Sequence, residues 1–375
     1  MRNVEEQDAL AQRVGCTVEA YGMLPEPASP VVLMVSGGSD SVALARLLPR
    51  VCPGYAYTIL HINHQLRGED ADGDERFVRD LARDLKLPCE VRCVDVAALA
   101  AAQTNGNVEE VGRAARYQAA EELLDELCQQ AGYALEQGRV ATAHTRDDRA
   151  ETLLMRLVVG GGASGLSSIP FVNGRTIRPL LDCTRAELRE WLRAESGSGS
   201  EDGNGRDQGD AVFWREDETN WDTRHLRAFV RHEVIPLLES RNPQLLATVA
   251  RSLDVLADES AYLQQQADEL FAEVCESKSS AVPGSAPEGL TLNTSLFNAD
   301  PVLVRRVIRE ACRRVMPSTA RVTFKHIENI AAHGRHIGFA TDIPGDVTVR
   351  NVYGTLIIRR KTAAEKPKHD PRRTL

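Results

Sequence analysis

The stretch VVLMVSGGSDSVALARLL, residues 31–48, predicts a strand, a tight turn and a helix in immediate succession. Its first five residues are apolar and include three valines, which is typical of a strand buried on both faces of a parallel sheet. After the two glycines, apolar residues recur at spacings of three and four between Val42 and Leu48, as they do along one face of a helix. Asp40 or Ser41 is the expected N-cap residue of that helix. The stretch therefore predicts a βα unit with a glycine turn at its corner.

The corner of this unit gathers groups that bind an anion. Gly37 and Gly38 lack a Cβ atom, so backbone N–H groups can come close to a ligand there. Ser36, Ser39 and Ser41 add hydroxyl groups, and the helix N-terminus adds positive partial charge. We therefore expect these residues to bind a phosphate, although an ordinary tight turn is the alternative explanation of a glycine pair.

Asp40 indicates which kind of phosphate this corner would bind. A carboxylate beside a phosphate is repelled unless a cation lies between them, and the Mg²⁺ ion of ATP is the usual one. We therefore predict that ATP binds at the loop from Ser36 to Ser41 and that Asp40 is a ligand of Mg²⁺. The loop also resembles that of the PP-loop ATP pyrophosphatases, in which S-G-G-x-D-S holds the pyrophosphate part of ATP while a substrate is adenylated.

The bulk composition is compatible with a cytoplasmic enzyme. The chain has 375 residues, 42% of them apolar, which is enough for two or three domains with a buried core. No run approaches the ~18 to 20 apolar residues that span a membrane, and the polar, acidic start of the chain is unlike a signal peptide. The eight cysteines include no C-x-x-C pair, so reduced thiols are expected. We therefore expect a cytoplasmic protein without a membrane segment.

The charge is distributed unevenly along the chain. The net charge is −9, but residues 301–375 contain 16 Lys and Arg against 6 Asp and Glu. Clustered Lys and Arg can contact the phosphates of a nucleic acid whatever the global charge, although a solvated basic surface would give the same count. We expect any polyanionic partner to meet residues 290–361, and residues 362–375 to form a disordered tail.

Strands and helices alternate downstream of the first βα unit. The patterns predict further strands at 57–63, 90–96 and 139–143, and helices around 77–85, 108–131 and from about 146. Such alternation argues for an α/β fold with an open, twisted parallel sheet and helices on both faces. Ligands of these sheets bind at the carboxyl ends of the strands. We therefore looked for polar residues at the strand ends.

Polar clusters do follow the predicted strands. His61 and Asn63 end the second strand and are expected to contact the nucleotide, although a single histidine there is more often structural. Arg113 lies in the predicted helix 108–131 and could reach a phosphate or pair with a glutamate on a solvated face. His144 and Asp148 follow the fourth strand. In an adenylation reaction Asp148 would share Mg²⁺ with Asp40, and His144 would act on the α-phosphate or on a proton in transfer.

The order of the motifs narrows the resemblance to one family. Between Val31 and Pro236, S-G-G-S-D-S, H-I-N-H-Q-L-R-G, E-x-x-x-R-x-x-R-Y, A-H-x-x-D-D-x-x-E-T, I-R-P-L-L and E-D-E-T-N-x-D follow one another as in the tRNA(Ile)-lysidine synthetases. The resemblance implies a PP-loop fold of the adenine nucleotide alpha hydrolase type. It also implies a ligase that uses ATP to adenylate C2 of the wobble cytidine in the CAU anticodon of isoleucine tRNA. L-lysine then displaces AMP, which changes decoding from AUG to AUA.

The same resemblance carries over to individual residues and to the domain plan. It implies that Asp40, Arg113, His144, Asp148 and Arg227 are catalytic. It predicts an adenylation domain at 1–222 with a disordered insertion near 196–210, a helical central domain at 223–280 and a basic part at 290–361 that contacts tRNA. A homodimer is an open expectation.

Other functions also remain open for the sequence. A tRNA 2-thiolation enzyme has the same loop but typically carries a C-x-x-C pair or a catalytic cysteine in its PP-loop half. An amidotransferase would need an ammonia source. A non-catalytic RNA-binding protein would keep the basic C-terminal part but would not need Asp40, His144 and Asp148 together.

Overall fold

The chain forms two compact units in the computed structural model. The structure describes residues 2–63, 69–95, 99, 108–160, 163–166, 169–195, 214–215, 225–279, 289–317 and 320–362. The first unit comprises Met1–Gly161 with Gly165–Asp254, and the second comprises Gly162–Ser164 with Val255–Leu375. The division falls within helix α11 (Leu245–Val274). Residues of the predicted central domain 223–280 therefore occur in both units, and the three functional parts stay a prediction.

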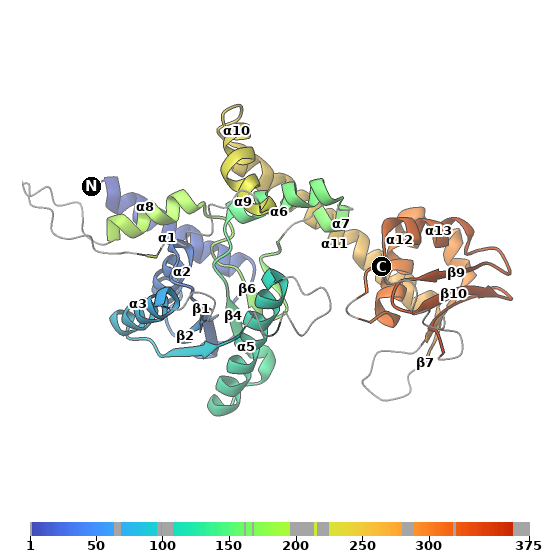
Figure 1. Cartoon of the computed structure of the whole chain (residues 1–375), viewed down its shortest axis with the longest axis horizontal. Helices are drawn as coiled ribbons and strands as arrows, with labels where there is room; N and C mark the ends of the chain where they lie inside the picture. The colour runs from blue at the N-terminus through green and yellow to red at the C-terminus, as the bar shows by residue number, and fades with distance from the viewer. Residues whose placement is uncertain are drawn as a thin grey trace, which may run out of the picture. The chain divides into compact units, whose positions relative to one another are not determined.

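The first unit contains a six-stranded sheet in the order β3-β2-β1-β4-β6-β5 (Figure 1). Its strands are β1 (Pro30–Met34), β2 (Ala56–Asn63), β3 (Cys89–Cys93), β4 (Arg139–Ala141), β5 (Val172–Asn173) and β6 (Thr176–Ile177). Neighbouring strands from β3 to β6 are parallel, and β5 pairs antiparallel with β6 at the edge. The predicted parallel sheet is confirmed. The edge hairpin was not predicted, because strands of two residues show no periodicity.

Helices cover both faces of this sheet, so it has two cores. The described helical elements of the first unit before residue 196 are α1 (Arg2–Ala20), α2 (Ser39–Val51), α3 (Glu69–Leu85), α5 (Val108–Ala131), η1 (Leu135–Gln137), α6 (Arg146–Val159) and α8 (Arg185–Glu195). The short helix α7 (Ala163–Leu166) is divided between the two units. On β1, Val31 and Leu33 pack in one core with α1, α2 and α8, whereas Val32 packs with Leu124 of α5 in the other. This burial on both faces explains the continuous apolar run of the strand.

Helix α2 begins earlier than predicted. Its N-cap residue is Gly38, with extended backbone angles and no side-chain capping bond, so the predicted caps Asp40 and Ser41 are wrong. Gly37 has a φ of +95°, a left-handed conformation that glycine adopts readily, and it completes the turn before the helix. Asp40 and Ser41 consequently lie in the first helical turn, where their side chains are available for other contacts.

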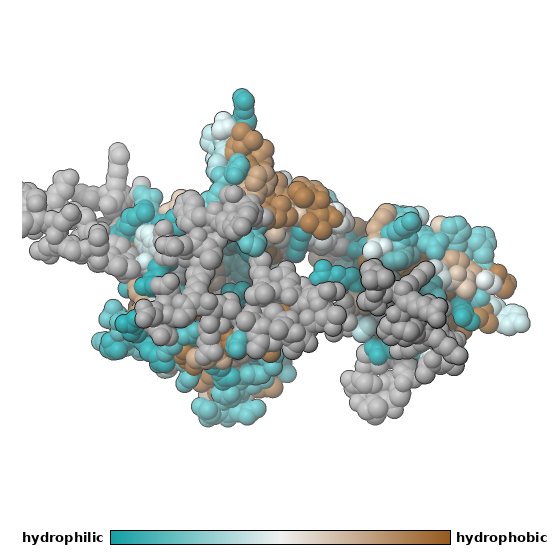
Figure 2. Space-filling model, viewed as in Figure 1, coloured by the Kyte–Doolittle hydropathy of each residue, from teal (hydrophilic) through white to brown (hydrophobic). Residues whose placement is uncertain are grey.

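The first unit continues as a nearly unbroken helical run through α9 (Leu226–Phe229), the π-helical turn η3 (Val230–Val234), α10 (Ile235–Glu239) and the start of α11. Val230 and Ile235 pack against Ala150 of α6, which brings this run to the sheet. Figure 2 shows apolar side chains on the surface around α10 and the end of α6, where Val159 and Leu237 are exposed. The predicted helical character is confirmed, with the π-turn as an addition.

The second unit combines helices with a five-stranded antiparallel sheet in the order β7-β8-β11-β10-β9. Its elements after α11 are β7 (Cys275–Ser279), β8 (Gly289–Asn293), η4 (Thr294–Asn298), α12 (Pro301–Val315), α13 (Phe324–His333), β9 (Ala340–Ile343), β10 (Val347–Val352) and β11 (Thr355–Arg360). Tyr353 and Gly354 both have positive φ between β10 and β11, as a tight hairpin turn requires. The predicted β-rich end is confirmed.

Two further features of the fold concern the state of the cysteines and membrane-spanning helices. All eight cysteines are free thiols, as predicted. Across the described ranges, the structure has no helix of the length and apolarity that crossing a membrane requires. At the boundary between the predicted central domain and the predicted basic part, β7 includes residues 277–279 and Gly289 begins β8. The predicted insertion 196–210 and residues 363–375 of the predicted tail lie outside the described residues.

Candidate active site

The glycine loop after β1 is held in shape by its own hydroxyl groups. Ser41 Oγ donates to the carbonyl oxygen of Gly38 at 2.9 Å and accepts from the amide of Ser36 at 3.2 Å. Ser39 Oγ donates to Asp40 Oδ1 at 3.2 Å. Ser41 therefore stabilises the loop, and the groups suited to a phosphate are the backbone amides of the first turn of α2 and the exposed Ser36.

Arg185, the first residue of α8, joins the loop to the acidic residues of α6. Its Nε donates to Asp40 Oδ2 at 3.2 Å, its Nη1 to Glu151 Oε1 at 2.6 Å and its Nη2 to Asp148 Oδ1 at 2.5 Å. Its backbone amide donates to Asp147 Oδ2 at 3.0 Å. Four carboxylates from two helices therefore converge on one residue at the carboxyl edge of the sheet.

Two further arginines approach the same carboxylates from α9 and η3. Arg227 donates from Nη2 to Asp148 Oδ1 at 2.7 Å and from Nε to Glu151 Oε2 at 2.9 Å. Arg231 donates from Nε to Glu151 Oε1 at 2.7 Å. The spacing of four residues places Arg227 and Arg231 close together along the helical run, and the π-turn that contains Arg231 is a feature often found at functional sites. Arg227 thus lies at the cluster, and its catalytic role stays a prediction.

The surroundings of Asp148 and Asp40 shift the pKa values of these two carboxyl groups in opposite directions. Burial opposes ionisation of Asp148, but the charges of Arg185 and Arg227 outweigh it and hold its pKa far below the usual range. Burial raises the pKa of Asp40, and the neighbouring Asp148 and Asp147 raise it further against the opposing charge of Arg185. An added cation would therefore be favourable beside Asp40, where negative charge is least compensated.

The carboxylates fit a magnesium ion that arrives with a nucleotide. Within the ranges that the structure describes, no group of three or more His, Cys, Asp or Glu is placed to hold a metal ion by itself. Mg²⁺ on a nucleotide typically takes one or two protein carboxylates and completes its shell with phosphate oxygens and water. Asp40 and Asp148, which converge on Arg185, offer that donor set. Their role as Mg²⁺ ligands stays a prediction.

His144 lies directly after β4, at the edge of this cluster. Its Nδ1 lies 2.9 Å from Thr142 Oγ1. Burial lowers the pKa of His144 to about 4, and the charges of Arg178, Arg113 and Arg227 add to this effect against the opposing Asp148. The imidazole is therefore neutral at pH 7, and a neutral ring can accept a proton during a reaction.

The depressed pKa of His144 makes stability depend on pH. An unfolded chain takes up this proton at a pKa of about 6.5, so the contribution is fully present above that pH and declines as the pH falls toward 4. We expect the wild-type protein to lose about 2 kcal/mol more than a His144→Gln variant between pH 7 and pH 5. Urea unfolding of both proteins at the two pH values measures this difference. Parallel pH dependences would contradict it.

The other predicted site residues lie in different settings. Arg113 is exposed on α5, with its guanidinium 5.2 Å from the ring centroid of Tyr117. His61 is buried, and its Nδ1 lies 2.9 Å from the carbonyl oxygen of Val35. Asn63 donates to Glu75 at 3.3 Å. The side chains of His61 and Asn63 are thus engaged within the protein, and their contact with a nucleotide stays a prediction.

Sequence analysis missed Arg185, the residue that organises the cluster. Its partner Asp40 lies 145 positions away, so no local spacing connects the two. One local signal was available: an arginine at the first position of a helix opposes the positive end of the helix dipole, so it needs nearby acidic groups.

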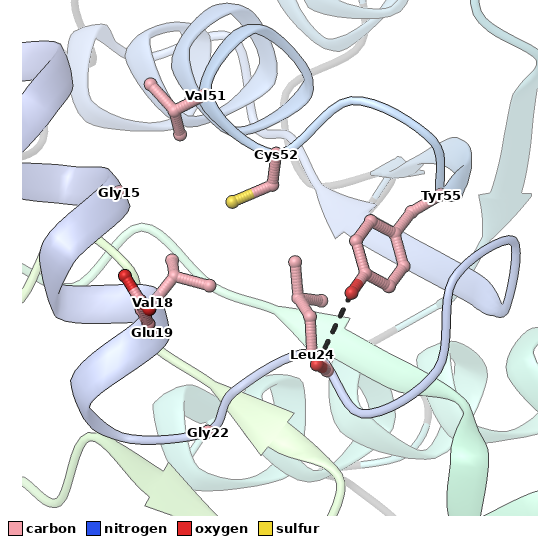
Figure 3. A pocket seen from close by; sticks show the side chains of 8 residues that line it. All are labelled: Gly15, Val18, Glu19, Gly22, Leu24, Val51, Cys52 and Tyr55. Carbon is pink, nitrogen blue, oxygen red and sulfur yellow. Dashed lines mark hydrogen bonds between the residues drawn. The ribbon is translucent and has the colours of Figure 1, made fainter.

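A separate pocket lies at the other end of α2 from the glycine loop. It has a volume of about 440 Å³ and is lined by Gly15, Val18, Glu19, Gly22, Leu24, Val51, Cys52 and Tyr55 (Figure 3). Tyr55 donates to the carbonyl oxygen of Leu24 across it at 3.4 Å. Its lining includes none of the clustered acids and arginines described above, so we place the candidate site at the strand ends instead.

Comparison with known proteins identifies a family and relatives that are similar to this chain. Residues 10–238 match the PP-loop domain family. A tRNA(Ile)-lysidine synthase from Geobacter sulfurreducens is 31% identical over 97% of this chain and 72% of that protein. One from Caldanaerobacter subterraneus subsp. tengcongensis is 28% identical over 96% and 71%. The solved U34-tRNA thiolase NcsA from Methanococcus maripaludis is 16% identical, with a TM-score of 0.46 over 67% of this chain and 79% of that one, a likeness too weak to indicate function.

Proposed function

The chain belongs to the tRNA(Ile)-lysidine synthase family, and on this premise we propose that it ligates L-lysine to the wobble cytidine of isoleucine tRNA with a CAU anticodon, using ATP. The observation that carries the proposal is the meeting of Asp40 from the glycine loop with Asp148 and Glu151 around Arg185. In this arrangement the glycine loop, which would bind phosphate, and the cluster of carboxylates and arginines would contact the same substrate at the carboxyl edge of the sheet.

The proposed reaction has two steps, each of which suits the residues present. In the first, the O2 atom of cytosine attacks the α-phosphate of ATP, and pyrophosphate leaves. The cationic groups of Arg113 and Arg227 would stabilise charge that develops on the phosphate. Mg²⁺ held by Asp40 and Asp148 would shield the phosphates from the carboxylates.

In the second step, the neutral amine of lysine attacks C2, and AMP leaves. The amine must give up a proton as the carbon–nitrogen bond forms. His144 is suited to accept it, because its low pKa keeps the ring unprotonated before the step. We propose His144 as this acceptor.

Incubation of the purified protein with ATP, Mg²⁺, labelled L-lysine and unmodified isoleucine tRNA tests the proposal. We expect label in the RNA, with one AMP released per lysine, and no label when the wobble cytidine is replaced by uridine. AMP formation without label in the RNA would contradict lysine as the nucleophile. Absence of both products would contradict the adenylation chemistry itself.

Further parts of the proposal concern location and partners. We propose that the enzyme acts in the cytoplasm and that residues 290–361 contact the tRNA, since residues 301–375 hold an excess of Lys and Arg. A homodimer stays a prediction, which sedimentation of the purified protein would test.

A further inference from the structure

Among the described residues, Arg178 is a buried cation without an acidic partner. Two arginines of the described residues are almost wholly buried, Arg149 with 2% and Arg178 with 4% of its surface exposed. Arg149 pairs with Asp254 at 2.5 Å. Arg178 donates from Nη1 to the carbonyl oxygen of Pro170 at 2.7 Å, its Nε has no hydrogen-bond partner, and it has no ion pair with a carboxylate within the described ranges. A buried charge without a counter-charge is unfavourable unless a ligand supplies one.

Arg178 lies among residues of the candidate active site. It follows β6 directly, and the amide of Thr142 donates to Ile177 at 3.0 Å, so the ends of β4 and β6 are side by side. His144 lies two residues after Thr142, and the charge of Arg178 helps to lower the pKa of His144. The charge of Arg113 acts on both His144 and Arg178. The paired ends of β4 and β6 therefore bring Arg178 and His144 to the same part of the carboxyl edge.

Tyr117 adds a further polar group at this position. Its ring lies under the guanidinium of Arg113, and it also acts electrostatically on Arg178. The phenolic oxygen of Tyr117 is buried and lies within hydrogen-bonding reach of Arg178, whose Nε has no hydrogen-bond partner. Buried polar atoms are normally satisfied, so the unpaired Nε of a buried arginine indicates a missing polar ligand.

The chemistry of these groups selects the ligand. Arg113 and Arg178 contribute two guanidinium groups, and Tyr117 contributes a hydroxyl donor. The nearby carboxylate Asp148 is already engaged by Arg185 and Arg227. The position therefore has an excess of donors and positive charge, which suits a phosphate group, because guanidinium groups bind phosphate oxygens with charge-assisted hydrogen bonds.

We propose that Arg178, together with Arg113 and Tyr117, forms a phosphate subsite beside His144. The inference deepens the proposed function, since an enzyme that joins ATP chemistry to RNA brings two kinds of phosphate to this edge. The ligand is a phosphate group either of the nucleotide or of the RNA backbone next to the reacting base. Arg178 and Arg113 supply the positive charge that neutralises the phosphate, and Arg113 does so from α5.

Thermal unfolding in the presence of inorganic phosphate tests the subsite directly. About 20 mM sodium phosphate or pyrophosphate should raise the unfolding temperature of the wild-type protein by roughly 3 °C over sodium chloride of equal ionic strength. Arg178→Met should lose at least half of this rise, since the glycine loop can still bind phosphate. Arg149→Met is the matched control: it removes an equally buried arginine and should lower the baseline, but it should keep the response to phosphate.

Two results would overturn the proposal. One is a wild-type protein that does not respond to phosphate, and the other is an Arg178→Met protein that responds as the wild type does. Should Arg178→Met fail to fold, Arg178→Lys takes its place, since it keeps the positive charge but loses the planar fork. Its response should fall by at least half, and an unchanged response would equally overturn the proposal.

Binding measurements identify the source of the phosphate. In Arg178→Met, Kd should rise at least about tenfold for ATP with Mg²⁺ if the nucleotide supplies the phosphate, or for isoleucine tRNA if the RNA does. Unchanged Kd values for both would overturn the proposal. None of these measurements uses lysine transfer. The subsite can therefore stand even if the proposed reaction fails, and the reverse also holds.

Discussion

Replacement of Asp40 by asparagine is expected to lower kcat for lysine transfer by at least about 1,000-fold without lowering the unfolding temperature. Asparagine has the same shape, and its oxygen can still accept the hydrogen bond from Ser39. The lost negative charge is the one that would hold the magnesium ion of ATP against the glycine loop. The α-phosphate would then lack both its shielding and its alignment for attack.

The unchanged stability follows from the surroundings of the carboxylate. Burial raises the pKa of Asp40, and Asp148 and Asp147 add to the effect, so the folded protein disfavours the ionised form. A neutral asparagine therefore costs little in folding free energy. Arg185 loses one partner but keeps Asp148 and Glu151.

The measurement combines thermal unfolding with a rapid-quench assay of AMP and pyrophosphate release. Asp182→Asn is the matched control, because Asp182 forms its ion pair with Arg146, at 2.7 Å, and not with a residue of the glycine loop. Its kcat should stay within about twofold of the wild-type value. An Asp40→Asn enzyme that kept more than about a tenth of wild-type kcat would contradict the role of Asp40 in binding magnesium.

Local sequence patterns were sufficient to predict the parallel sheet and the glycine loop. The run from Val31 to Val35 is apolar at every position because the strand is buried on both faces, and such a run can be recognised without knowledge of its neighbours. The two glycines and the helical pattern that follows then define the corner. The antiparallel edge strand β5 escaped prediction, because two residues are too few to show a period of two.

The centre of the candidate site depends on tertiary contacts that local patterns do not show. Asp40 and Asp148 were found because each lies at a strand-to-helix corner, where ligands of such sheets bind. Arg185 comes 34 residues after Glu151 and 145 after Asp40, so only the folded sheet brings the three together. Likewise, nothing local distinguishes Arg178 from a solvated arginine, since its burial without an acid depends on β4, β6 and α5.

Replacement of Glu151 by glutamine should destabilise the protein by about 3–5 kcal/mol, or lower its unfolding temperature by roughly 10 °C. The Glu151 side chain is 0% exposed and accepts hydrogen bonds from Arg185, Arg227 and Arg231. Glutamine removes the negative charge and directs an amide N–H group at guanidinium donors. Three arginines would then share a largely buried position with too little counter-charge, and urea unfolding at pH 7 measures the loss.

A control and a pH series separate this effect from ordinary loss of an ion pair. Glu121→Gln removes a partly exposed carboxylate from Arg175, which keeps Asp125, and should cost less than about 1 kcal/mol. Burial opposes ionisation of Glu151, but the hydrogen bond from Arg231 and the charge of Arg185 outweigh it and lower its pKa. Its stabilising charge is therefore fully present above the usual carboxyl pKa of about 4.3 and is lost as the pH falls through the lower folded value. The difference in free energy of unfolding between the wild type and Glu151→Gln should therefore decrease as the pH falls over that interval. A constant difference would mean that side-chain packing, not charge, makes Glu151 important.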